Sequence, residues 1–153
     1  MKNENTINEV SFKLESGNSM AICGPSGAGK STLLNLLSGL DNPDKGEIYY
    51  DNTCFSDLSD SEKILFRLQN ISVVFQSPNL LKDFNVIENI MLPIRYRGVS
   101  KKQCREIAMH CLNEVGCQDH ADSSITTLSG GEAQRVGIAR AMAKSSKIIF
   151  ADE

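Results

Sequence analysis

The stretch that decides the fold is Gly24-Pro25-Ser26-Gly27-Ala28-Gly29-Lys30-Ser31-Thr32. Residues 24–31 match the pattern G-x-x-x-x-G-K-[ST]. A mostly apolar run at residues 19–23 precedes the loop, and the leucine-rich run 33–37 follows it. The order strand, glycine-rich loop and helix is the context in which this pattern binds phosphate. The sequence therefore predicts an α/β fold built on a P-loop nucleotide-hydrolase core.

The residue types of this loop suit a nucleotide. Glycines let backbone N–H groups turn toward phosphate oxygens, and a helix that begins near Lys30 directs the positive end of its dipole at them. Lys30 adds a full charge near the β- and γ-phosphates, and the Ser31 hydroxyl is suited to Mg²⁺. We therefore expect residues 24–32 to bind Mg-ATP. The alternative is a glycine-rich turn that binds no ligand.

Composition limits the class of protein. The chain has 153 residues, of which 41% are apolar and 23% charged, as in one ordinary soluble domain with a buried core. Its apolar runs are shorter than the roughly 18 residues that a membrane-spanning helix requires. The N-terminus has no apolar signal segment, which predicts a cytosolic location. A net charge of -3 offers no basic surface for nucleic acid, so we expect no nucleic-acid partner.

The five cysteines form no C-x-x-C pair, and their number is odd. We expect them to be reduced rather than to form a disulfide framework. Cys104 and Cys111 lie seven residues apart in a predicted helix and hence on one face. Because no histidines cluster with them, core packing is the better interpretation than metal binding.

Hydrophobic periodicity and turn residues predict the remaining elements. The predicted strands are short apolar runs bounded by polar residues, at 47–50, 71–75 and 147–151. The predicted helices run from 30 to about 39, from the S-x-x-E capping box at 59–62 to about 68, within 101–115, and onward from 129–131. We interpret residues 77–128 as a helical subdomain that separates two parts of a nucleotide-binding core, 1–76 and 129–153.

Two acidic residues, Asp152 and Glu153, follow the last predicted strand. An open α/β sheet has its ligand crevice at the carboxyl ends of its strands, so both carboxylates are expected beside the nucleotide. There Asp152 can hold Mg²⁺, and Glu153 can act as the general base toward an attacking water. An exposed acidic pair at a strand end is the alternative, and it is the better interpretation only if the glycine-rich loop is ignored.

Residues 128–135, Leu-Ser-Gly-Gly-Glu-Ala-Gln-Arg, resemble the LSGGQ signature of ABC transporter ATPases. The sequence departs from this signature at Glu132-Ala133, around the usual glutamine. The resemblance implies that Ser129, Gly130 and Gly131 face the γ-phosphate bound by a second protomer, so that two chains enclose ATP head to tail. Without the resemblance, the same residues can be read as a structural helix cap.

Gln76 resembles the family's Q-loop glutamine, which contacts Mg²⁺ or the attacking water. Residues 75–81 and 88–98 are similar to the branch that contains lipoprotein-releasing, macrolide-exporting and antimicrobial-peptide transport ATPases. The resemblance implies ATP hydrolysis that powers transport, with export as the expected direction. It also implies a transmembrane permease that contacts residues 76–96 and holds the chain at the inner face of the membrane. The transported substrate is not indicated.

Two family features fall outside the sequence. The aromatic residue that stacks on adenine precedes the first core strand, and Phe12 fits that strand rather than this role. The family's D-loop and switch histidine follow the position of Glu153. We therefore expect the sequence to be a fragment of a longer protein with feeble turnover. Two alternatives stay open: a soluble ABC-type ATPase that acts in DNA repair or translation, and a catalytically inactive remnant.

Overall fold

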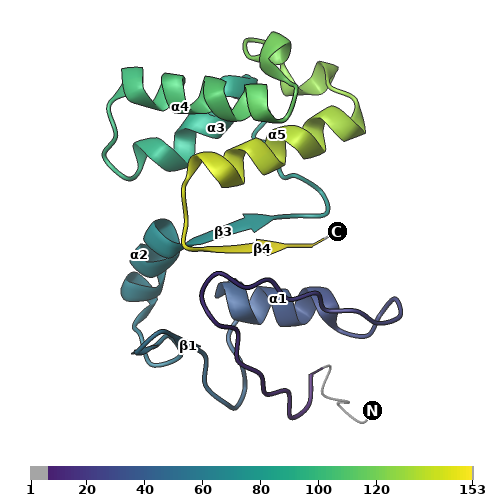
Figure 1. Cartoon of the computed structure of the whole chain (residues 1–153), viewed down its shortest axis with the longest axis vertical. Helices are drawn as coiled ribbons and strands as arrows, with labels where there is room; N and C mark the ends of the chain where they lie inside the picture. The colour runs from purple at the N-terminus through teal and green to yellow at the C-terminus, as the bar shows by residue number, and fades with distance from the viewer. Residues whose placement is uncertain (1–6, 153) are drawn as a thin grey trace. The chain divides into compact units, whose positions relative to one another are not determined.

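The computed structural model describes residues 7–152 (Figure 1). Its contacts divide the chain into two units, residues 1–56 and 57–153. The helices are α1 (Lys30–Ser38), α2 (Asp60–Asn70), α3 (Val86–Arg95), α4 (Lys101–Glu114) and α5 (Gly130–Ala143), with short 3-10 turns at Gln118–His120 and Ile125–Thr127. The strands are β1 (Tyr49–Tyr50), β2 (Thr53–Cys54), β3 (Ile71–Val74) and β4 (Ile148–Ala151).

The first unit is organised around α1, which begins at Lys30 directly after the glycine-rich loop. The helix ends where it was predicted to end, because Gly39 has a φ of 70° and donates its N–H to the carbonyls of Asn35 and Leu36. A residue with a Cβ rarely adopts this left-handed conformation, which glycine adopts without cost. The end of α1 is thus fixed by one glycine.

The hairpin of β1 and β2 belongs to the same unit. Its strands pair antiparallel, with Tyr49 opposite Cys54 and Tyr50 opposite Thr53. Tyr50 contacts Phe55 edge to face, with ring centroids 5.5 Å apart, and its hydroxyl donates to the carbonyl of Leu37. Phe55 is only 2% exposed. These contacts attach the hairpin to α1 within the unit.

Two predictions for the first unit are wrong. Residues 19–23 and the run around Phe12 were expected to be strands, but in the described residues they have no regular structure. Met20 is 45% exposed and Phe12 46%, so neither run has the cover that a core strand requires. The predicted strand 47–50 is reduced to Tyr49–Tyr50. A strand needs a neighbouring strand, and among residues 7–56 only the hairpin strands pair.

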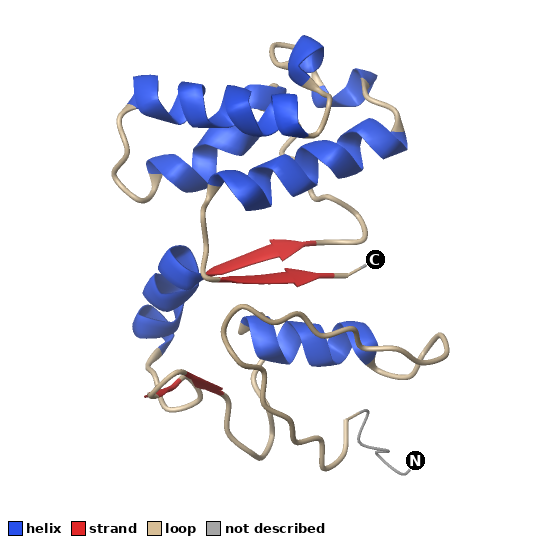
Figure 2. Cartoon of the chain, viewed as in Figure 1, coloured by secondary structure: helices blue, strands red, loops and turns tan. Residues whose placement is uncertain are grey.

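The second unit contains a parallel pair of strands and a group of helices (Figure 2). Both apolar runs form strands as predicted, and β3 pairs with β4 from Ile71 opposite Ile148 to Val74 opposite Ala151. α5 packs on β3, and α3 and α4 pack on α5. A continuous apolar run such as 148–151 is typical of a strand covered on both faces. Ile149 is 54% exposed, however, so β4 is not covered in this way. In the described chain β4 has a partner strand on one side only.

Side chains from α3, α4 and α5 form the core of this unit. Its largest fully buried apolar side chains are Val86, Ile87, Ile90, Leu112 and Val136. Cys104 and Cys111 are buried in the same cluster, which confirms their expected role in core packing. No helix within residues 7–152 is both long and apolar enough to span a bilayer.

Candidate functional site

The glycine-rich loop forms an exposed turn that leads into α1. Gly29 occupies the position before the helix with a φ of 87° and has no side chain that could accept a helix N–H. The first helical bond runs from the Leu33 N–H to the Gly29 carbonyl at 2.8 Å. The N–H groups of residues 30–32 therefore have no acceptor inside the helix and point toward the loop. Such a helix start binds phosphate oxygens readily.

Lys30 lies across the same loop. Its Nζ donates to the carbonyls of Gly24 and Pro25, each at 2.9 Å. The ammonium group is thus held over the loop by the loop's own backbone. A phosphate that enters the loop would meet this charge together with the N–H groups of the first turn of α1. The binding of phosphate by residues 24–32 stays a prediction.

The carboxyl edge of the β3–β4 pair carries two of the predicted site residues. The Asp152 N–H donates to the Val74 carbonyl at 2.9 Å, which continues the parallel ladder past Ala151. Gln76 lies two residues after Val74, the last residue of the neighbouring strand β3. The structure therefore brings Asp152 and Gln76 to the same sheet edge. Glu153, the predicted general base, lies outside the described residues.

The signature residues form the N-terminus of α5. Ser129 is the N-cap: its Oγ accepts from the Glu132 N–H at 3.3 Å, and the Glu132 carboxylate accepts from the Ser129 N–H at 2.7 Å. The hydrogen bonds from the Ser129 side chain and backbone lower the pKa of Glu132. His120 Nε2 lies 3.2 Å from the other carboxylate oxygen. The glutamate that replaces the usual glutamine is therefore engaged in capping the helix.

Gly130 and Gly131 are exposed in the first turn of α5. A Cβ added at Gly130 would meet no atom within 4 Å, and one at Gly131 would make only an ordinary contact with Arg135. Glycine in a helix costs about 1 kcal/mol relative to alanine. Packing within the described chain does not require either glycine. The space above them remains open to the close approach of a ligand.

Asn89 is a structural residue that the sequence analysis missed. It is 1% exposed, and its side chain accepts from the Leu81 N–H at 2.7 Å. Its amide donates to the carbonyls of Leu81, Phe84 and Asn85 at 3.0 to 3.1 Å. It thus supports the loop that follows Gln76. The available signal was a polar residue on the apolar face of the helix 86–95.

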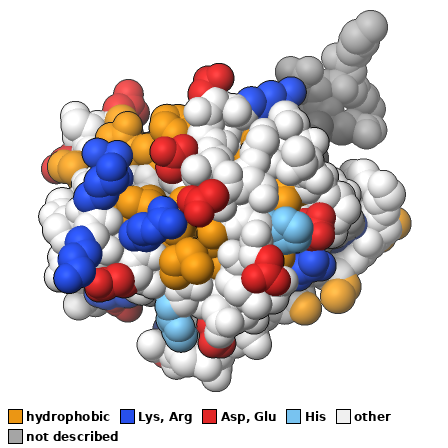
Figure 3. Space-filling model, turned by 90° about the horizontal axis from the view of Figure 1, so that it is seen from above, with side chains coloured by type: hydrophobic (Ala, Val, Ile, Leu, Met, Phe, Trp, Pro, Cys, Tyr) orange, Lys and Arg blue, Asp and Glu red, His pale blue; other side chains and the backbone are white. Residues whose placement is uncertain are grey.

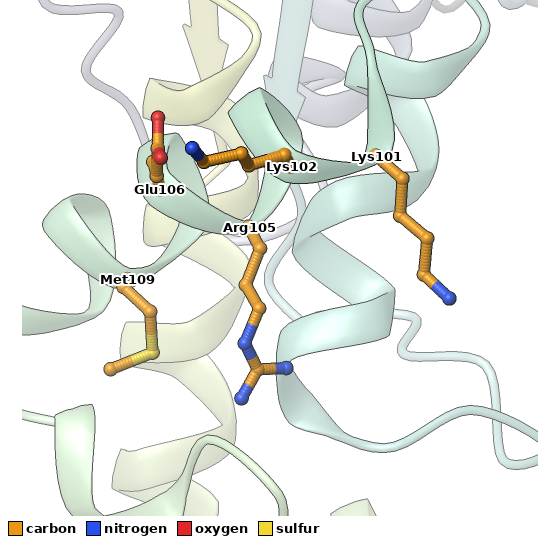
Figure 4. Close-up of a pocket in the computed structure, with 5 residues that line it drawn as sticks. All are labelled: Lys101, Lys102, Arg105, Glu106 and Met109. Carbon is orange, nitrogen blue, oxygen red and sulfur yellow. The ribbon is translucent and has the colours of Figure 1, made fainter.

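Two hollows lie on the second unit. One is a groove of about 400 Å³, lined by residues that include Phe75, Leu81, Leu92, Tyr96, Arg140 and Lys144. The other lies on α4 and is lined by Lys101, Lys102, Arg105, Glu106 and Met109, whose side chains diverge (Figure 4). A binding site needs polar groups that converge on a ligand. The diverging side chains of the α4 hollow do not provide such a set of groups. Seen from above, acidic and basic side chains alternate around apolar patches (Figure 3).

The glycine-rich loop before α1 matches the phosphate-loop pattern of the P-loop fold class, and the second unit separately carries Asp152 at the edge of its parallel strand pair. The family model for the ABC transporter matches residues 7–153. This chain belongs to the ABC transporter family.

Relatives and solved structures agree with the assignment. The lipoprotein-releasing system ATP-binding protein LolD of Bdellovibrio bacteriovorus is 46% identical over 144 residues, which are 94% of this chain and 66% of that protein. The uncharacterized ABC transporter ATP-binding protein MJ1508 of Methanocaldococcus jannaschii is 43% identical over 147 residues, or 96% of this chain and 66% of the relative. The dimeric ATP-binding cassette MJ0796, in a post-hydrolysis state bound to ADP and Pi, superimposes with a TM-score of 0.92 at 38% identity. That match covers 97% of this chain and 66% of the cassette.

These matches confirm the resemblance to ABC transporter ATPases, including the lipoprotein-releasing branch, and the α/β P-loop fold with its helical part. The chain spans slightly less than two thirds of the length of the relatives, 66% for the LolD of Bdellovibrio. The roles of the individual site residues stay predictions.

Proposed function

We propose that this chain binds and hydrolyses Mg-ATP as the ATPase part of a membrane transporter. The observation that carries the proposal is the phosphate loop, in which a glycine-capped helix start and the Lys30 ammonium converge on one exposed turn. In the proposed mechanism, the N–H groups of residues 24–32 bind the phosphates, and Lys30 neutralises charge on the β- and γ-phosphates.

The remaining site residues orient the metal and the water. Ser31, Gln76 and Asp152 supply a hydroxyl, an amide and a carboxylate oxygen, the hard donors that Mg²⁺ prefers. Mg²⁺ would neutralise the charge that develops on the phosphates. Glu153 is proposed to accept a proton from the attacking water, and Gln76 to orient this water. The position of Gln76 beside Asp152 at one sheet edge supports these roles.

The signature residues are proposed to act on a second copy of the chain. Ser129, Gly130 and Gly131 would bind the γ-phosphate held by the partner's loop, with the positive end of the α5 dipole directed at it. The open space above both glycines supports such an approach. The description of the related cassette as a dimer bound to ADP and Pi supports the paired arrangement.

The proposed membrane partner is a permease, by analogy with the lipoprotein-releasing relatives. Its docking site would be the groove of about 400 Å³ beside Tyr96, whose lining includes Leu81 and Leu92 from the expected contact region 76–96. The partner would hold the chain at the inner face of the membrane, and export is the proposed direction. In this scheme residues 77–128 act as the helical subdomain between the core parts 1–76 and 129–153.

Equilibrium binding of Mg-ATP tests the proposal, with Lys30→Ala as the variant and Lys101→Ala on α4 as the matched control. Saturable binding is expected for the wild type and the control, and its loss in Lys30→Ala. Hydrolysis that disappears in Glu153→Gln would exclude an inactive remnant. Co-purification with a membrane protein would distinguish a transporter from an ATPase of DNA repair or translation. A folded chain without Mg-ATP binding would refute the proposal.

A further inference from the structure

One face of α5 contacts the segment 75–79, which contains Gln76. The contacting residues are Gln134, Gly137 and Arg140, which are spaced three residues apart and lie within about a third of the helix circumference. The segment follows β3 directly and has no regular structure. Its carbonyl groups must find their hydrogen-bond partners outside a sheet or helix.

Two of the α5 side chains supply such partners. Gln134 Nε2 donates to the Phe75 carbonyl at 3.1 Å. The Arg140 guanidinium donates to the Asn79 carbonyl at 2.9 Å and, through its other terminal nitrogen, to the Pro78 carbonyl. Arg140 is half-buried, and this burial lowers its pKa. A planar guanidinium with several donors suits two neighbouring carbonyls better than an ammonium does.

Gly137 sets the distance between α5 and the segment. It is buried, and a Cβ built on it would lie 2.9 Å from the Cβ of Pro78. Real Cβ contacts are almost never this short. The absence of a side chain therefore lets the helix approach closely enough for Gln134 and Arg140 to reach the backbone.

We propose that Gln134, Gly137 and Arg140 form a backbone clamp that fixes the segment 75–79 to α5. The proposal rests on the proposed function, in which Gln76 and the signature residues both act on the nucleotide. Gln134 lies four residues after Gly130, about 6 Å along a rigid helix. The clamp therefore holds Gln76 in a fixed position relative to the signature residues. The clamp residues Gln134, Gly137 and Arg140 are positioning residues, because none of them touches the nucleotide in this scheme.

The clamp has a functional consequence. A shift of α5 that brings Ser129–Gly131 to a partner's nucleotide must move the segment 75–79 with it. Orientation of the attacking water by Gln76 would then depend on engagement of the signature.

Two measurements on the whole protein test the clamp, in Arg140→Met, Arg140→Lys and Gln134→Leu. The control is Arg105→Met, which removes an exposed guanidinium from α4. The first measurement is the rate of tryptic cleavage after Lys82, in the turn that follows the segment, with cleavage after Lys101 as the internal reference. The second is ATP turnover divided by the Mg-ATP bound at saturation. This ratio is insensitive to an inactive fraction, so a merely structural role would not change it.

Release of the segment should accelerate cleavage after Lys82 about tenfold in Arg140→Met, with a smaller effect in Arg140→Lys and none in the control. Turnover per bound nucleotide should fall about tenfold, while the Kd for Mg-ATP stays at the wild-type value. Unchanged cleavage would overturn the clamp, and accelerated cleavage with unchanged turnover would refute its positioning role. If the wild type binds no ATP, the proposed function fails, and the cleavage rates still decide whether the clamp exists.

Discussion

Replacing Gly137 by alanine has two opposite effects on the free energy of unfolding, and the sign of each is known. The glycine lies in the interior of α5, where alanine is favoured by about 0.8–1.0 kcal/mol. The added Cβ would stand 2.9 Å from the Pro78 Cβ. Pro78 has a rigid ring, and its carbonyl accepts a hydrogen bond from Arg140. Pro78 therefore cannot easily move away from the added methyl group. Overpacking of this kind costs about 1–3 kcal/mol, which leaves a net destabilisation of about 1 kcal/mol. The melting temperature should fall by about 2–4 °C for a chain of this size.

A double-mutant cycle with Pro78→Gly, followed by circular dichroism in guanidinium chloride, isolates the contact. The second substitution removes the Cβ that the new methyl group would meet, and its own backbone effects cancel in the cycle. In that background Gly137→Ala should stabilise the chain by about 1 kcal/mol, because only the helix propensity remains. The sign of the effect therefore reverses between the two backgrounds. Stabilisation in the wild-type background, or the same effect in both, would refute the close approach of α5 to the segment 75–79.

Three further substitutions test other parts of the second unit. Asn89→Leu should lower the free energy of unfolding in urea by about 3 kcal/mol, because it removes the partners of the loop 81–85; a loss below about 1 kcal/mol would contradict that role. Ser129→Ala should cost about 1 kcal/mol through loss of the α5 cap, whereas an unchanged stability would show that the cap contributes nothing. Burial, together with the neighbouring Arg97 and Arg67, lowers the pKa of Lys144 from 10.5 to about 8. The unfolded chain therefore binds more protons than the folded chain between these pH values, and the Lys144 contribution to stability rises with pH across that window. The stability of the wild type relative to Lys144→Met should increase between pH 7 and pH 10 in thermal melts, and a constant difference would argue against the lowered pKa.

The predictions that succeeded depended on local signals. The capping box at Ser59 starts α2 at the next residue, and Gly39 ends α1. Both signals act through hydrogen bonds between residues a few positions apart, so a short window of sequence contains all the information. The strands β3 and β4 were predictable for a different reason. Each is a short apolar run bounded by polar residues, which is typical of a strand, but the pattern did not show that the two strands pair with each other.

The features that the sequence did not predict depend on distant partners. Residues 19–23 have the composition of a strand, but a strand forms only where a neighbour accepts its hydrogen bonds. The contact between Gln134 and Phe75 joins positions 59 residues apart, and that between Arg140 and Asn79 joins positions 61 apart. The local sequence pattern does not distinguish Gln134 and Arg140 from the ordinary polar residues on the solvent-facing side of a helix. Only the path of the chain after β3 gives them their partners.

The signature of this chain shows how one residue can satisfy folding and function together. The N-cap of α5 needs an acceptor three residues after Ser129, and either glutamine or glutamate provides it. Glutamate adds a negative charge close to the proposed position of a partner's γ-phosphate, where it opposes binding. In this structure the carboxylate accepts from the Ser129 N–H at 2.7 Å, and its other oxygen lies 3.2 Å from His120 Nε2. The departure from the usual glutamine is therefore compatible with an anion site, because the bonds that cap the helix also hold the carboxylate in place.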